Sequence, residues 1–231
     1  MTELASPIRL DVVDSTNREA LRRIAAGAPH GTVIQARQQT DGRGRRGRSW
    51  ISPPGNLYAT LIVRPPGDAP VAQLGFVAAL GAGDALRRHA PVRFKWPNDL
   101  MLEGRKLGGI LVETTEGAAA VGIGINIASA PEDTETPATH LPASVTPDAL
   151  LDDIRACFDV WYRCWRDDGF APLREAWLHH GIGLGEPIRA RLARETVEGV
   201  FGGLDADGGL LLDRDGARRV IAAGDVFLGT S

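Results

Sequence analysis

The sequence predicts an α/β (α+β) protein, in which helices pack on a mixed β-sheet and a small all-β domain follows. Two observations carry this prediction. Up to about residue 180, β-rich runs alternate with longer segments whose apolar spacing is that of helices. After Gly185 only short β runs remain, separated by the turns Asp207-Gly208 and Asp215-Gly216. We therefore expect one domain over residues 1–184 and a small SH3-like barrel over residues 185–231.

The N-terminal half begins with a strand over residues 8–13 and continues into a helix. Asp14 and Ser15 are candidate N-caps for this helix, Thr16 and Glu19 have the spacing of a capping box, and Gly27 offers a stop. The segments that follow are expected to be a strand at 32–36, a polar loop at 38–56, a strand at 57–63 and a glycine-weakened helix at 70–90.

The next segments continue this alternation up to the second domain. They are expected to be a strand at 92–96, a hairpin over 100–113, a buried strand at 118–127, a loop at 131–147 and helices at 147–167 and 170–180. Pro147 suits the first turn of its helix, with Thr146 as the cap.

Composition excludes several classes of protein. The 231 residues carry a formal charge of −3, with 43% hydrophobic and 24% charged residues, which is typical of a soluble globular protein and argues against general nucleic-acid binding. Residues 1–20 contain no apolar signal segment, and the apolar run 118–130 is too short to span a bilayer. Cys157 and Cys164, on one helix, would lie ~10 Å apart, so we expect reduced thiols in a cytoplasmic protein.

Lysine is rare in this chain. Of 26 basic residues only Lys95 and Lys106 are lysine, and the others are arginine. The two side chains are not interchangeable where a compact ammonium group is needed. Either chance or a requirement for lysine explains the two exceptions.

The segment 42–48, GRGRRGR, concentrates four arginines between three glycines. Such a loop suits a phosphate or carboxylate ligand, because glycine lets backbone N–H groups face an anion. It also satisfies the spacing of a dinucleotide-binding loop, but residues 49–55 (SWISPPG) cannot open the helix that this motif requires. An RNA-binding Arg-Gly segment and a solvated charged loop remain the alternatives.

Three further segments combine glycine or proline with isolated polar residues. They are residues 95–100 (KWPNDL), 106–113 (KLGGILVE) and 122–126 (GIGIN). Glycine within a strand often marks the close approach of a ligand. A strand-ending turn, an edge-strand lysine and a bulge with a buried Asn are the corresponding structural interpretations. The sequence contains no zinc-ligand spacing and no Gly-x-Ser-x-Gly nucleophile motif.

Taken together and in order, these segments resemble the biotin protein ligase family. The resemblance is carried by Ser15-Thr16-Asn17, Gln39, GRGRRGR, Trp50, KWPNDL, KLGGILVE and GIGIN, and by the C-terminal stretches 202–212 and 224–226. It covers nearly the whole chain.

The resemblance implies a two-step reaction. Biotin and ATP form biotinoyl-5′-adenylate and pyrophosphate, and a lysine of a biotin carboxyl carrier domain then takes the biotinyl group and releases AMP. Lys106 and Arg45 are the implied catalytic residues. The implied biotin-binding residues are Ser15, Thr16, Asn17, Gln39, Arg43, Gly44, Arg45, Lys106, Gly108 and Gly109. The implied ATP-binding residues are Arg43, Arg45, Arg46, Arg48, Trp50, Asn98, Asp99, Lys106 and Asn126. Mg²⁺ is expected mainly on the substrate phosphates, with no protein metal site.

Two departures from the family pattern affect what is expected. Gly108 stands where the family often has Ala. The pattern begins at about residue 8, so the form without an N-terminal DNA-binding domain is expected, in the cytoplasm and without nucleic acid or membrane as partners. The partner is expected to be the carrier domain of acetyl-CoA carboxylase or a related carboxylase, and the protein to be a monomer or a homodimer. A lipoate or octanoate ligase of the same fold is the alternative function.

Overall fold

The computed structural model describes residues 6–67, 69–115, 117–142 and 144–229, so the two outer ends of the predicted domains lie outside the described residues. The elements of the first domain, in chain order, are β1 Ile8–Val13, α1 Thr16–Ala25, β2 Val33–Gln39, η1 Arg45–Gly47, β3 Leu57–Val63, η2 Val71–Gln73, α2 Leu74–Leu86, β4 Arg93–Lys95, β5 Asp99–Leu102, β6 Arg105–Thr115, β7 Ala118–Ile125, α3 Pro147–Asp168 and α4 Ala171–His180. The strands of the second domain are β8 Pro187–Arg191, β9 Thr196–Leu204, β10 Leu210–Arg214, β11 Ala217–Ile221 and β12 Asp225–Leu228.

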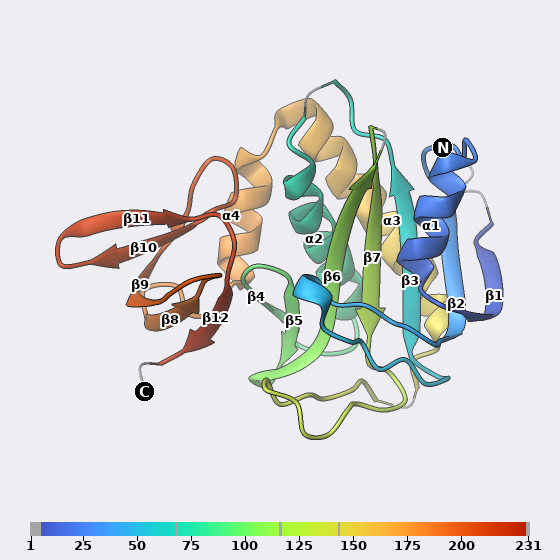
Figure 1. Ribbon diagram of the computed structural model, residues 1–231, viewed down its shortest axis with the longest axis horizontal. Coiled ribbons are helices and arrows are strands. Elements are labelled where there is room, and N and C mark those ends of the chain that lie inside the picture. The colour runs from blue at the N-terminus through green and yellow to red at the C-terminus, as the bar shows by residue number, and fades with distance from the viewer. Residues whose placement is uncertain (1–5, 68, 116, 143, 230–231) are drawn as a thin grey trace.

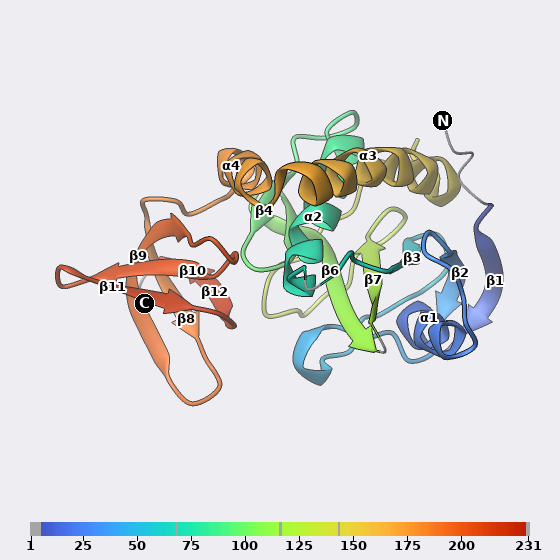
Figure 2. The same cartoon turned by 90° about the horizontal axis from the view of Figure 1, so that it is seen from above.

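The first domain is built on one mixed seven-stranded sheet. Its strand order is β1-β2-β3-β7-β6-β5-β4, with β1 parallel to β2 and each of the other neighbouring pairs antiparallel. Helices α2, α3 and α4 lie on one side of the sheet, whereas α1 and the turn η1 lie on the other (Figures 1 and 2). None of the helices in the described part of the chain is long and apolar enough to cross a membrane.

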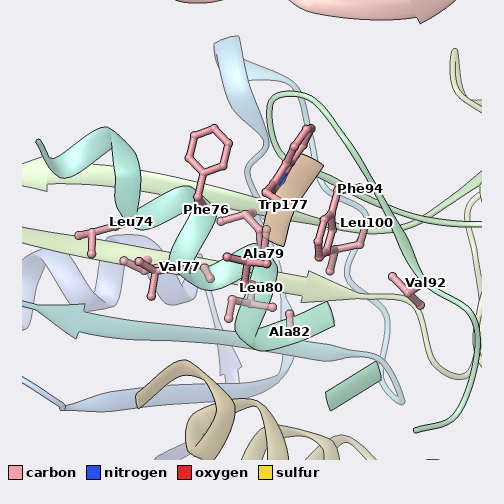
Figure 3. Packing of buried hydrophobic residues seen from close by; sticks show 14 of the residues in the cluster. Leu74, Phe76, Val77, Ala79, Leu80, Ala82, Val92, Phe94, Leu100 and Trp177 are labelled. Carbon is pink, nitrogen blue, oxygen red and sulfur yellow. The ribbon is translucent and has the colours of Figure 1, made fainter. Parts of the chain in front are cut away.

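The large core lies between the sheet and α2–α4. Helix α2 is nearly apolar all round and is buried along most of its length, so packing against its neighbours stabilises it even though it contains glycines. Gly81 lies against α3, and Gly83 lies against Phe94. Figure 3 shows Phe76, Phe94 and Trp177 gathered around this helix. The Trp177 ring lies 5.7 Å from Phe76 edge-on and 5.9 Å from Phe94 in a stacked arrangement.

A much smaller cluster lies under α1 on the opposite side. Ala20 and Ile24 of the helix pack there on Ile34, Ile62 and the first residues of β7. The rest of this side, over β3, β7 and β6, opens into a cavity. This cavity is the candidate site.

The second domain is a five-stranded antiparallel sheet with the order β11-β10-β9-β8-β12. It is joined to the first by specific contacts: the indole N–H of Trp96 donates to Gly208 O at 3.0 Å, and Gln73 donates to Ala206 O at 3.4 Å. Both acceptors lie in the loop that contains the predicted Asp207-Gly208 turn. The attachment brings the start of β12 against the first domain.

The predicted fold class is confirmed, with differences at particular elements. The predicted capping box at Thr16 and Glu19 was wrong. Helix α1 begins at Thr16 after Ser15, but no side chain caps it, and Glu19 binds Arg22 and Arg23 instead. The predicted helix at 70–90 begins as a 3₁₀ turn and ends at Leu86. Strand β12 was missed. The cap of α3 was correct, since the Thr146 hydroxyl accepts from Ala149 N. Cys157 and Cys164 lie on α3 and are free.

Candidate active site

A cavity opens on the α1 side of the sheet, over β3, β7 and β6, and is bounded on one side by the second domain. Its lining includes these predicted residues: Ser15, Thr16, Asn17, Gln39, Arg43, Gly44, Arg45, Arg48, Trp50, Asn98, Asp99, Lys106, Gly109 and Asn126. Two predicted residues do not line it. Arg46 points to the second domain, and Gly108 lies beneath Gly124 O in the sheet.

The closed end of the cavity is polar although it is buried. Ser15, Thr16 and Asn17, at the start of α1, are 2–4% exposed. Gln39 Oε1 accepts from the Thr16 N–H at 2.8 Å and from its hydroxyl at 3.1 Å. Hydroxyl and amide groups held this way present both donors and acceptors to a ligand.

Asn17 is fixed by three neighbours. Its Nδ2 donates to Glu113 at 2.9 Å and to Leu111 O at 3.3 Å, and its Oδ1 accepts from the Thr60 hydroxyl at 2.7 Å. Thr60 is fully buried and also lies 2.9 Å from Thr16 Oγ1. Sequence reasoning missed Thr60 and Glu113, since a threonine inside an apolar strand gives no signal by itself.

Two glycines of β7, Gly122 and Gly124, line the middle of the cavity. The Trp50 ring lies directly over Gly124, where an added Cβ would come within 2.8 Å of the ring, and Gly122 lies under the side chain of Asn17. The Trp50 indole nitrogen is buried without a hydrogen-bond partner. The two glycines of GIGIN thus admit the side chains of Asn17 and Trp50, while the approach of a ligand at this segment stays a prediction.

The arginine segment 42–48 forms a small closed loop. Gly44 N donates to Arg48 O and Trp50 N donates to Gly42 O, with a turn at Arg46 and Gly47, both at positive φ. Glycine suits position 47 because an L side chain rarely adopts φ +74°. The loop thereby holds its guanidinium groups at the rim of the cavity.

The loop is joined to the second domain through Asp225, at the start of β12. Asp225 pairs with Arg48 at 2.9 Å, Arg46 at 3.3 Å and Arg45 at 4.0 Å. Burial alone would raise the pKa of this carboxyl, but the guanidinium groups of Arg48 and Arg46 outweigh it and lower the pKa. Burial lowers the pKa of Arg45, which nevertheless stays charged because guanidinium is so basic.

Arg45 also connects the loop to the sheet. Its Nη1 donates to Asn98 Oδ1 at 3.4 Å and to Gly224 O at 3.1 Å, while Asn98 Nδ2 donates to Ile110 O at 2.6 Å. Asn126, 2% exposed, donates to Thr139 O at 3.0 Å. Both asparagines are thus held at the rim by backbone carbonyls.

Lys106 and Lys95 meet on one carboxylate. Lys106 Nζ lies 2.6 Å from Asp99 Oδ1, and Lys95 Nζ lies 3.1 Å from Asp99 Oδ2. Lys106 also lies 5.5 Å from the centre of the Trp50 ring, in a cation–π position. Sequence reasoning singled out both lysines but included only Lys106 in the site.

Among the described residues, no three His, Cys, Asp or Glu side chains gather closely enough to hold a metal ion. Asp99, which lies beside Lys106 in the cavity, already pairs with two ammonium groups.

Fold and site together define a class of protein. The mixed sheet carries a cavity that is polar and buried at one end and cationic at the other, beside a small β domain. Such a cavity suits an anionic ligand with a polar head. Comparisons with known proteins identify the family. Residues 10–128 match the Biotin/lipoate A/B protein ligase family, and residues 183–229 match the Biotin protein ligase C terminal domain.

Individual relatives agree with this assignment. The chain is 43% identical over 235 residues to a biotin--[acetyl-CoA-carboxylase] ligase of Paracoccus denitrificans, covering 94% of this chain and 98% of the relative. It is 33% identical to the bifunctional ligase/repressor BirA of Bacillus subtilis, covering 95% of this chain and 73% of that protein. The structure of a biotin protein ligase from Aquifex aeolicus in complex with biotin and ATP has a TM-score of 0.85 at 28% identity, over 98% of this chain and 99% of that one.

The chain therefore belongs to the biotin protein ligase family, and as a member of it the protein is a ligase.

Proposed function

We propose that the protein uses ATP to activate biotin as biotinoyl-5′-adenylate and transfers the biotinyl group to a lysine of a biotin carboxyl carrier domain. One observation carries the proposal: a single cavity contains a buried polar end, formed by Ser15, Thr16 and Asn17, and a cationic rim, formed by Lys106 and the arginine loop. The polar end suits the donors and acceptor of a ureido ring. The cationic rim suits a carboxylate beside a triphosphate.

In the first step an oxygen of the biotin carboxylate attacks the α-phosphorus of ATP, and pyrophosphate leaves. Two anions must come together, so cations are needed to neutralise the developing charge. We assign this task to Lys106, at the junction of carboxylate and α-phosphate, and to Arg43 and Arg45 of the loop. Gly44 and Gly109 leave room for the ligand beside these cations.

The nucleotide would lie along Trp50 and the rim. The Trp50 ring, over Gly124, offers an aromatic face for the adenine, and Asn98, Asp99 and Asn126 offer polar contacts at the edge. Arg46 and Arg48, which pair with Asp225, would meet the phosphates when the loop closes. Gly108 supports this region from within the sheet, outside the cavity.

Mg²⁺ fits this site as an ion that ATP brings with it. The triphosphate of ATP carries the oxygen ligands that Mg²⁺ prefers, and water would complete its coordination. The bound ion would supply neutralisation of the phosphate oxygens, while Lys106 and the arginines orient the reacting groups.

In the second step the amine of the acceptor lysine attacks the biotinyl carbonyl carbon, the new amide bond forms, and AMP leaves. The printed name of the Paracoccus relative supports acetyl-CoA carboxylase as the source of the acceptor domain. We propose residues 1–184 as the catalytic domain and 185–231 as the C-terminal domain, in line with the two family matches. The free Cys157 and Cys164 support a reducing compartment such as the cytoplasm.

Intact mass spectrometry tests this function directly. The purified protein, Mg-ATP and biotin are incubated with a biotin carboxyl carrier domain, in parallel with lipoate, and with Lys106→Arg as the matched variant. We expect a mass shift with biotin only, reduced at least 100-fold in rate by Lys106→Arg, because a planar guanidinium cannot replace a compact ammonium at the junction. A shift with lipoate alone would refute the proposal in favour of the lipoate branch, and no shift with either would refute it outright.

A further inference from the structure

The only two lysines of the sequence share one carboxylate. Each Asp99 oxygen takes one ammonium group: Oδ1 takes Lys106 at 2.6 Å and Oδ2 takes Lys95 at 3.1 Å. In a chain whose other basic residues are all arginine, this placement accounts for both exceptions at once. The rarity of lysine in the sequence is thereby related to one contact in the structure.

The backbone fixes Lys95 opposite Asp99. The two residues are paired across the antiparallel strands β4 and β5, and Lys95 Nζ also donates to Thr136 Oγ1 at 3.3 Å. All three side chains line the cavity, but those of Lys95 and Asp99 are only 10% and 12% exposed, whereas that of Lys106 is 24% exposed. Lys95 is therefore the anchored member of the cluster and Lys106 the accessible one.

We propose that Lys95 is a positioning residue for the adenylation step: it occupies one oxygen of Asp99, so that Asp99 holds Lys106 through the other oxygen alone. The inference deepens the proposed function and rests on it. Two ammonium groups on one carboxylate leave the cluster with one net positive charge. Without Lys95, Asp99 would be free to neutralise Lys106 with both oxygens and to hold it back from the substrate phosphate.

The same geometry explains why position 95 is lysine. An arginine there would offer a planar fork, which binds both oxygens of a carboxylate at once. Such a fork would compete with Lys106 for Oδ1. A point ammonium takes one oxygen and leaves the other.

The test uses the full chain and the biotin-dependent exchange of pyrophosphate into ATP. Lys95→Met removes the ammonium group, Lys95→Arg keeps the charge but adds the fork, and Thr136→Val removes the other contact of Lys95. We expect kcat for exchange to fall about 10- to 100-fold in both Lys95 variants, with the Kd for biotin within about twofold, and Thr136→Val to stay within about threefold of the parent. Lys95→Gln replaces Lys95→Met should the latter not fold, as judged by thermal melting.

Three results would overturn the inference. They are a folded Lys95→Met (or Lys95→Gln) protein with unchanged kcat, full kcat in Lys95→Arg, and a loss in Thr136→Val as large as that in Lys95→Met. A purely structural role would change the melting temperature while leaving kcat of the folded fraction unchanged. Exchange that is missing in the parent protein would instead refute the proposed function, so the two failures are distinguishable.

Discussion

The two faces of the seven-stranded sheet are made by the same strands and yet perform different tasks. In β7, residues 119, 121, 123 and 125 enter the large core beneath α2 and α3. Their neighbours face the other way: Ala118 and Ala120 pack under α1, and Gly122 and Gly124 lie beneath Asn17 and Trp50. Side-chain alternation with a period of two thus gives one strand a stabilising face and a binding face.

The difference shows how stability and binding are separated in this protein. On the core face, each fully buried Val or Ile contributes about 1.5–3 kcal/mol by burial of apolar surface. On the site face, small residues leave space and polar side chains bind one another. Substitutions on the two faces should therefore affect different measurements, and the following predictions test that separation in order of decreasing effect.

The largest effect is expected from Gly122→Ala compared with Val121→Ala. A Cβ at position 122 would lie 3.0 Å from Asn17 Cγ and closer still to its Oδ1, and Asn17 cannot yield easily because Thr60, Leu111 and Glu113 hold it. Overpacking of about 1–3 kcal/mol should weaken biotin binding about 10- to 100-fold, as measured by titration calorimetry.

The neighbouring Val121→Ala is the matched control for that comparison. It should lower the free energy of unfolding by about 1–3 kcal/mol through lost apolar contacts, with little change in the Kd for biotin. Equal effects of the two variants on both stability and binding would contradict the separation of the faces.

Thr60→Val should give the next largest effect. Valine keeps the volume in β3 but removes the hydroxyl that contacts both Thr16 and Asn17. Loss of a buried hydrogen bond of this kind amounts to about 1–2 kcal/mol, so we expect biotin affinity to fall about tenfold in the same calorimetric titration. Unchanged affinity would show that the Thr60 contacts do not support the binding face.

Asp225→Asn tests how the second domain contributes to the binding face. The substitution removes the negative charge with which Arg45, Arg46 and Arg48 pair. Because these ion pairs join the loop to the second domain, we expect faster tryptic cleavage of loop 42–48 in the ligand-free protein. The arginines are partly exposed, so the free energy of unfolding should change by only about 1 kcal/mol.

Biotin with ATP should protect the loop from trypsin in both proteins, because we expect the loop to close over the bound ligands. Equal cleavage with and without these ligands would show that the loop does not close over them.

The last prediction concerns stability at alkaline pH and Tyr58, on the site face of β3. Its hydroxyl donates to Pro53 O at 2.8 Å, and burial raises its pKa to about 12. Since the unfolded chain deprotonates this group near pH 10, its contribution is fully present below pH 10 and is lost as the pH rises towards 12. We expect a loss of about 1.4 kcal/mol at pH 11, measured by urea unfolding.

Tyr58→Phe should reduce this alkaline loss by the same amount, although it also removes the hydrogen bond to Pro53. The loss between pH 9 and pH 11 is therefore the quantity to compare in the two proteins. An identical alkaline loss in both would assign it to other groups.

Local patterns in the sequence predicted most elements of both domains. Alternation and β-rich composition identified β1, β3 and β7, and Thr146-Pro147 correctly marked the start of α3. The start of α1 was predicted correctly, with Ser15 at the N-cap position. The capping box was wrong, because Thr16 binds Gln39 and Glu19 binds arginines. Strand β12 was missed because Asp225–Leu228 is too short to show a period.

Sequence alone determined the candidate residues. The arginine loop, the two lysines and the glycines of β7 stand out by local composition or spacing, and the polar start of α1 was added by the family resemblance. Only the tertiary structure decided which side chains meet. Lys95 and Lys106 meet on Asp99, Trp50 lies over Gly124, and Thr60 contacts Asn17. Asp225 pairs with Arg48 of the arginine loop across 177 residues of sequence. These contacts depend on strand register and on the docking of the second domain, and both are set by the summed burial of many side chains rather than by any local pattern.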